Sequence, residues 1–177
     1  MFADTQVFYV VFRLLHIVAG VLWVGSAFLF GAFIGPAAAE VAPTAGPLFG
    51  VLVHKRKLPK VIVGLGAVTV VAGWIMWLGR MNDYGGIGDW VGTTFGRVLT
   101  IGAILATIAF FVGWLGIGRN VERLVALGDQ IAAGGGPPTA EQSAEMGRVQ
   151  KAVEVAGKVD LALLLLAVAA MSTARYW

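Results

Sequence analysis

Apolar residues fill four long stretches of this chain, and charged residues, glycine and proline gather between them. The stretches cover residues 10–34, 61–78, 98–117 and 161–174. A membrane core about 30 Å thick takes about 20 helical residues to cross. Every backbone polar group inside that core must be paired within the protein. The pattern therefore predicts four transmembrane helices rather than membrane-spanning strands.

The fourth stretch is the shortest of the four, and apolar residues just before it extend it backwards. These residues are Val153, Val155, Ala156 and Val159. We therefore expect the fourth span at about 157–175, at the end of a longer helix.

The first stretch is followed directly by Gly35 and Pro36, a pair that commonly ends a helix. We expect the first helix to end there. The second helix is expected to begin through Pro59, because proline is tolerated in a first helical turn. A signal peptide is the competing interpretation of the first stretch. Its apolar run exceeds the roughly 7–15 residues of a signal core, and residues 2–12 contain no basic residue, so we expect a retained helix.

Helical periodicity continues beyond the third stretch. Val121, Leu124, Val125 and Ile131 recur at helical spacing, so the third helix is expected to run on to about Ala133. The Gly-Gly-Gly-Pro-Pro sequence that follows breaks it.

The segment after this break can begin a new helix, because Thr139 and Gln142 have the spacing of a capping box. Residues 118–156 are therefore expected to form a helical hairpin that projects about 20 Å beyond the membrane, at ~1.5 Å per residue. This hairpin is either a solvated connector or a docking surface for a partner subunit.

Composition supports a membrane protein. The chain has 177 residues, of which 58% are hydrophobic and 13% charged, about half the roughly 25% typical of soluble domains. There is no cysteine, which excludes disulfides and thiolate metal sites. We expect one domain over residues 1–177, an all-α, antiparallel bundle of four transmembrane helices.

Basic residues are divided unequally between the two sides of such a bundle. Nine lie between helices 1 and 2 or between helices 3 and 4, and four lie on the other side. The positive-inside rule then places both termini outside the cytoplasm and the hairpin inside it. The net charge of +3 is small, and no aromatic-interleaved basic patch is present, so no nucleic-acid partner is expected.

Glycine is abundant within the apolar stretches, with 25 residues in the whole chain. Gly31 and Gly35 form a small-xxx-small pair, which lets membrane helices approach closely. This indicates tight packing in the lipid bilayer, and it is also typical of contacts in a homo-oligomer or with partner membrane subunits.

His16 is the main candidate for chemistry, because an ionisable side chain within a transmembrane segment is commonly functional. Arg13 lies one turn before it, and Gly20 and Trp23 follow on the same helix face. The predicted topology brings further residues to this outer half of the bundle, namely Met76, Arg97, Met171 and Arg175.

This set suits two cofactors. Haem b would take His16 as an axial ligand, with a methionine opposite or the position open, while Arg13, Arg97 and Arg175 pair with the propionates. Copper in its Cu(I) state would take His16 with the thioethers of Met76 and Met171. Alternatively no cofactor binds, and His16 hydrogen-bonds a neighbouring helix.

Other ionisable residues are expected to be structural. His54 is interpreted as a solvated residue at the membrane interface, and Asp160 as the partner of Lys158 in a local ion pair. No serine with a neighbouring histidine and acid, and no phosphate-binding glycine loop, is present, so the sequence identifies no catalytic group.

Residues 15–25, LHIVAGVLWVG, resemble the first-helix signature of a bacterial superfamily. It includes the copper-resistance protein D family, the haem-dependent protoporphyrinogen oxidases and the membrane domain fused to some urate oxidases. The remaining layout is similar to that of small four-helix relatives in this group. The resemblance implies a protein of the bacterial inner membrane in which His16 binds haem; Trp23, on the same helix face, is a candidate for the same site.

The sequence thus favours a small, haem-b-binding, redox-associated membrane protein, as an accessory subunit of a larger complex. The alternatives are a cofactor-free structural subunit that binds partners through its glycine-rich faces and hairpin, and a copper-binding or copper-transport protein.

Overall fold

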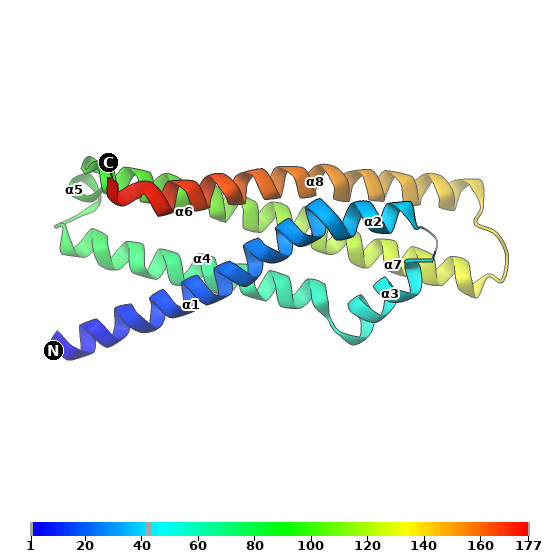
Figure 1. The fold of residues 1–177 in the computed structure, drawn as a ribbon, viewed down its shortest axis with the longest axis horizontal. Helices are drawn as coiled ribbons and strands as arrows, with labels where there is room; N and C mark the ends of the chain where they lie inside the picture. Colours follow the sequence, from blue (N-terminus) through cyan, green and yellow to red (C-terminus); the bar gives the residue numbers. More distant parts are fainter. Residues whose placement is uncertain (1, 42–43, 177) are drawn as a thin grey trace.

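The computed structural model describes residues 2–41 and 44–176, with the backbone alone at residues 2–5. In these ranges the chain is helical, and it runs as four long rods joined by short connections (Figure 1). The four rods are long and apolar enough to cross a membrane, and neighbouring rods are antiparallel, as predicted. The candidate spans lie within Gln6–Glu40, Leu58–Asp83, Thr94–Ala133 and Ala140–Tyr176.

The first rod corrects one prediction, because it does not end at Gly35 and Pro36. Helix α1, Phe2–Leu29, passes through a π-helical turn, Phe30–Ile34, into α2, Gly35–Glu40. The wider turn is closed by the Gly35 N–H, which donates to the Phe30 carbonyl. A Cβ at Gly35 would lie 2.8 Å from that oxygen, so glycine fits this turn. Because Pro36 then occupies a first-turn position of α2, its missing N–H interrupts no regular helix.

The second rod begins with a short connection that the sequence pattern did not predict to be helical. Helix α3, Gly46–Gly50, continues as a π-helical turn, Val51–Lys55. The long helix α4, Leu58–Asp83, then starts after Lys57, whose φ is 54°. Pro59 lies in the first turn of α4, as predicted.

The third and fourth rods form a long helical pair. Helix α5, Ile87–Gly92, caps the end of the bundle and precedes α6, Thr94–Phe111. A π-helical segment, Val112–Gly118, joins α6 to α7, Arg119–Ala133, and α8, Ala140–Thr173, returns to a final 3₁₀ turn, Ala174–Tyr176. The predicted capping box is confirmed, because Gln142 N–H donates to Thr139 Oγ1 at 3.1 Å and Thr139 N–H to Gln142 Oε1 at 2.9 Å.

The bundle is built from two helix pairs. Helix α1 packs mainly along α4, and α6 packs mainly along α8. In Figure 1, α1 crosses the bundle obliquely, so that its N-terminal end lies toward α4 and α2 lies toward α8. The central contact between the pairs is made by Trp23, Ala109 and Leu164, each at most 4% exposed.

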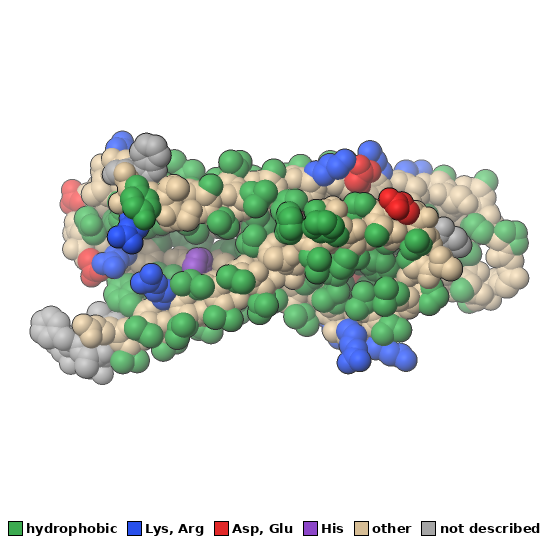
Figure 2. Space-filling view, in the orientation of Figure 1, with side chains coloured by type: hydrophobic (Ala, Val, Ile, Leu, Met, Phe, Trp, Pro, Cys, Tyr) green, Lys and Arg blue, Asp and Glu red, His purple; other side chains and the backbone are tan. Residues whose placement is uncertain are grey.

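In Figure 2, charged side chains gather at the end that holds the termini and in a second band across α8 and the connection before α4, and apolar side chains cover the surface between them. Large apolar side chains such as Val21 and Leu166 are 67% and 57% exposed. In water this much exposed apolar surface would be unfavourable, whereas lipid tails solvate it. The fold is therefore that of a multi-pass membrane protein.

Candidate functional site

The seam between α1 and α4 is built by large side chains of α1 that lie on small residues of α4. Tyr9 lies over Gly79, His16 over Gly73 and Trp23 over Gly66, while Gly20 faces Thr69. Each pair repeats the same antiparallel register. Close backbone approach at small residues is the usual means of packing helices in lipid, and here it also positions the histidine.

His16 is half-buried and held from two sides by α4. Its Nδ1 lies 2.7 Å from the carbonyl oxygen of Thr69, and a carbonyl can only accept, so Nδ1–H donates. A Cβ on Gly73 would lie 2.9 Å from Cε1 of the imidazole. The hydrogen bond fixes the tautomer and leaves Nε2 with a free lone pair. Histidines that bind metals typically show this arrangement.

Thr69 itself is 6% exposed, and its hydroxyl donates to the Leu65 carbonyl at 2.8 Å. The Thr69 backbone carbonyl has two lone pairs, so it accepts the imidazole N–H in addition to its helical partner. Sequence analysis did not identify Thr69. The signal was present in the spacing of Gly66, Thr69 and Gly73, which lie on one face of a helix.

Trp23, which the sequence placed with His16 in one site, lies in the core contact between the helix pairs. It is 4% exposed, and its ring meets the Phe110 ring edge-on, with centroids 6.4 Å apart. A Cβ on Gly66 would lie 3.0 Å from its Cε2 atom. Trp23 therefore packs between three helices, two turns along α1 from His16.

The three candidate arginines lie at the end of the bundle that holds both termini, and each is exposed. Arg13 lies one turn before His16 on α1. Arg97 donates from Nη2 to Thr94 Oγ1 at 3.3 Å, and the Arg175 guanidinium lies 5.4 Å from the Tyr176 ring centroid. Among the described residues, the contacts of Arg97 and Arg175 are thus local, and none of them joins these arginines to His16.

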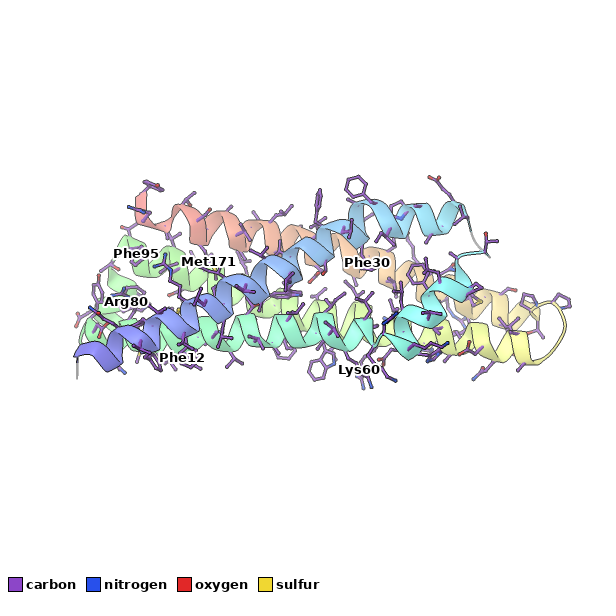
Figure 3. All side chains as sticks on the ribbon, turned by 60° about the horizontal axis from the view of Figure 1, so that its bottom comes forward. Phe12, Phe30, Lys60, Arg80, Phe95 and Met171 are labelled. Atoms are coloured by element: carbon purple, nitrogen blue, oxygen red, sulfur yellow. The ribbon has the colours of Figure 1, made fainter. Side chains whose placement is uncertain are left out.

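The two candidate methionines are half-buried on different helix pairs. Met171 lies on α8, at the same end of the bundle as Arg80 and Phe95 (Figure 3). Its Cγ would be 2.8 Å from a Cβ on Gly102 of α6, so it packs into the α6–α8 seam. Met76 lies on α4, one turn beyond Gly73. Within residues 2–41 and 44–176 no group of three or more His, Cys, Asp or Glu side chains could hold a metal ion.

The bundle is open on one side near the end that holds the termini. The space-filling view is hollowed between α1 and the α6–α8 pair, toward the end that holds the termini (Figure 2). The opening follows from the oblique course of α1, which meets α8 near its own C-terminal end and diverges from it toward Phe2 (Figure 1).

Two tryptophans of α4 join it to α6. Trp74 Nε1 donates to Thr107 Oγ1 at 2.9 Å, and Trp77 Nε1 donates to Thr100 Oγ1 at 2.8 Å. These bonds cross the bundle between the seam that holds His16 and the seam that holds Met171. Sequence analysis missed them, because pairing between distant helices leaves no local pattern.

Asp160 differs from expectation, whereas His54 is exposed, as expected of a solvated residue. In addition, His54 Nε2 lies 2.8 Å from Asp129 Oδ2, a contact between the π-helical turn Val51–Lys55 and α7 that the sequence did not predict. The predicted ion pair of Asp160 with Lys158 is wrong. Lys158 pairs with Glu154 at 2.6 Å, whereas Asp160 is 3% exposed. Residues four apart share a helix face and residues two apart do not.

Comparison of the chain with family models, curated proteins and solved structures finds no match.

Proposed function

We propose that this multi-pass membrane protein binds haem b through His16 and takes part in electron transfer, as a small subunit of a larger membrane complex. The observation that carries the proposal is the hydrogen bond from His16 Nδ1–H to the Thr69 carbonyl. Because Nδ1–H is committed to this bond, Nε2 is the ring nitrogen that remains for a ligand.

The side chains around His16 fit such a cofactor. The His16 imidazole packs against α4 at Gly73, where there is no side chain. Because α1 diverges from α8, there is space for an apolar group between these helices. Exposed arginines at the same end of the bundle, Arg13, Arg97 and Arg175, have the charge that propionates need. Haem, when bound, would supply one-electron chemistry. The resemblance of residues 15–25 to haem-binding first helices supports the same assignment.

The proposed orientation has both termini outside the cytoplasm of a bacterial inner membrane. Nine basic residues on the hairpin side against four on the other side support it. In this orientation, α7 and the first half of α8 project into the cytoplasm as a hairpin. Its arms are joined by an ion pair between Arg123 and Glu145. The hairpin is the surface we propose for a partner subunit.

A cofactor-free structural subunit is the second candidate, and the same hydrogen bond supports it. A histidine that donates to a carbonyl on the next helix is satisfied without any ligand, and the tight seams around Gly73 and Gly102 are sufficient reason for a stable bundle. Copper binding through His16, Met76 and Met171 is a third proposal, resting on the softness of thioether ligands.

Absorption spectroscopy separates these candidates. The protein is purified from haem-replete cells, and a reduced-minus-oxidised spectrum is recorded together with metal analysis. We expect a Soret band in the unmodified protein and its loss in His16→Ala, with helix content unchanged.

Two glycine variants on α4 test whether haem binding depends on the packing of His16 against Gly73. In Gly73→Ala the new methyl group would lie 2.9 Å from Cε1 of His16, so the ring must shift and the haem signal should weaken. In Gly64→Ala nothing lies within 4 Å of the new methyl group, so the signal should be retained. Haem-free protein from haem-replete cells would contradict the proposal and favour the structural subunit. Bound copper without haem would favour the third candidate.

A further inference from the structure

Asp160 is an ionisable residue that the haem proposal does not use. The predicted spans 10–34, 61–78, 98–117 and 157–175 contain five Lys, Arg, His, Asp or Glu residues, and of these Asp160 is the buried one; the others are Arg13, His16, Lys158 and Arg175. Asp160 is 3% exposed and lies on α8, about one turn beyond the end of the proposed hairpin at residue 156. A buried carboxyl group within a membrane span usually has a function.

The carboxyl group faces the inside of the bundle rather than the lipid. A Cβ on Gly113 would lie 3.3 Å from Oδ1 and 3.9 Å from Oδ2 of Asp160, so the absence of a side chain at Gly113 admits the carboxyl group against the backbone. Gly113 lies in the π-helical segment Val112–Gly118. Such segments within longer helices frequently mark functional sites.

Asp160 Oδ1 has no hydrogen-bond partner among the described residues. The nearest basic residue along the helix, Lys158, is directed to Glu154 instead. A carboxylate without a partner in a low-dielectric interior is strongly disfavoured. Something must therefore neutralise this group when the protein is folded in a membrane.

The residues around Asp160 restrict what can neutralise its carboxylate. Residues 98–118 of the facing rod and residues 17–39 of the first rod contain no Lys, Arg, His, Asp or Glu. On the adjoining ends, Arg119 of α7 and both Glu154 and Lys158 of α8 are exposed. Among the described residues, no basic side chain pairs with Asp160 Oδ1.

A metal ion is also a poor fit. Hard cations take about six or more oxygen ligands, usually from several carboxylates, carbonyl groups and waters. Within the described part of the chain no cluster of three acidic or histidine side chains is present. The smallest cation, a proton, needs one oxygen atom and no further ligand.

We propose that Asp160 is a proton-binding site inside the bundle, formed by its carboxyl group and the π-helical backbone at Gly113. One proton from water binds a carboxylate oxygen and forms the uncharged acid, and the same proton returns to water on release. No other bond changes. The site gives the membrane interior a group that takes up and releases protons, independently of whether haem binds at His16.

Infrared spectroscopy and a lipophilic carbodiimide test this proposal on the full protein in lipid vesicles. A protonated carboxyl group has a C=O stretching band that carboxylates lack, and pH-difference spectra should show it in the unmodified protein and in Glu154→Gln. Asp160→Asn should remove it. The carbodiimide adds to protonated carboxyl groups, so mass spectrometry should find it on Asp160 at neutral pH. An ordinary exposed glutamate is protonated in roughly 1 molecule in 500 at pH 7 and should stay unlabelled.

Three results would overturn the assignment. The first is an infrared spectrum in which Asp160→Asn changes only carboxylate bands between about pH 5 and 8. The second is protection of Asp160 from labelling by sodium or potassium, compared with choline at the same pH, which would indicate a metal-cation site. The third is a labelling map of the unmodified protein that shows exposed glutamates but not Asp160, together with no protonated-carboxyl band. Because His16→Ala should leave all of these signals unchanged, failure of the haem proposal is distinguishable from failure of this one.

Discussion

Gly66 is the position at which the structure makes the sharpest prediction about helix packing. A methyl group added there would lie 3.0 Å from Phe110 Cδ2 and 3.0 Å from Trp23 Cε2, and these rings come from two other helices. Trp23 is 4% exposed, so its ring has little room to move. We therefore expect Gly66→Ala to separate α1, α4 and α6 at the centre of the bundle.

The magnitude follows from a comparison with Gly64→Ala on the same helix. Alanine is preferred to glycine within a helix by about 1 kcal/mol, and this gain is common to both variants. At Gly64 nothing lies within 4 Å of the new methyl group, so no packing cost opposes the gain. At Gly66 overpacking of a dense core costs about 1–3 kcal/mol. The difference between the two variants should therefore be about 1–3 kcal/mol, with Gly66→Ala the less stable.

Equilibrium unfolding in mixed micelles of a mild detergent and dodecyl sulfate measures this difference through helix content. Trp23 fluorescence is a second probe, although five other tryptophans contribute to the signal. Equal stability of the two variants would refute the reasoning. It would mean that Trp23 and Phe110 yield without cost, and that the small residues of α4 do not set the distance between helices.

Three further predictions concern topology and the hairpin. Because the chain has no cysteine, single cysteines at Gly135 and Gly86 should react with impermeant reagents from opposite sides of the membrane, and labelling of Gly135 from outside intact cells would reverse the orientation. Thr139→Ala removes the side-chain acceptor of the capping box and should destabilise the start of α8 by about 1 kcal/mol, measured as faster amide exchange there, whereas unchanged exchange would argue against the cap. The hydrogen bond from Arg148, together with the charges of Arg148 and Arg123, lowers the pKa of Glu145. Its stabilising contribution is therefore present above the ordinary glutamate pKa of about 4.3 and is lost as pH falls through the lower folded value. The protection of amides in α7 and α8, taken relative to the intrinsic exchange rate at each pH, should fall in acid in the unmodified protein, and Glu145→Gln should show no such fall over the same pH range.

Much of the fold was determined by the sequence alone. Four apolar stretches were sufficient to predict four long helices, because a membrane core requires long apolar segments whose backbone is paired internally. The break before Thr139 and its capping box were also predicted, since glycine, proline and capping residues act over a few neighbouring positions. In contrast, Gly35 and Pro36 failed as a stop signal. A π-helical turn at Phe30–Ile34 absorbs their effect, and its presence depends on the wider fold.

The tertiary structure decided which side of each helix contacts its neighbours. In water an apolar stripe marks the buried face of a helix, but in lipid both the buried and the exposed faces are apolar, so the sequence of α4 does not show which side meets α1. The partner of His16 is a backbone carbonyl at Thr69, which any residue type could have provided. The burial of Asp160 depends on the missing side chain of Gly113, on a helix about 47 residues away in the chain. Sequence could show that a histidine and an aspartate lie within the spans. Only the packing of helices showed that one has a fixed tautomer and the other an unpartnered oxygen, because both properties depend on atoms of a neighbouring helix.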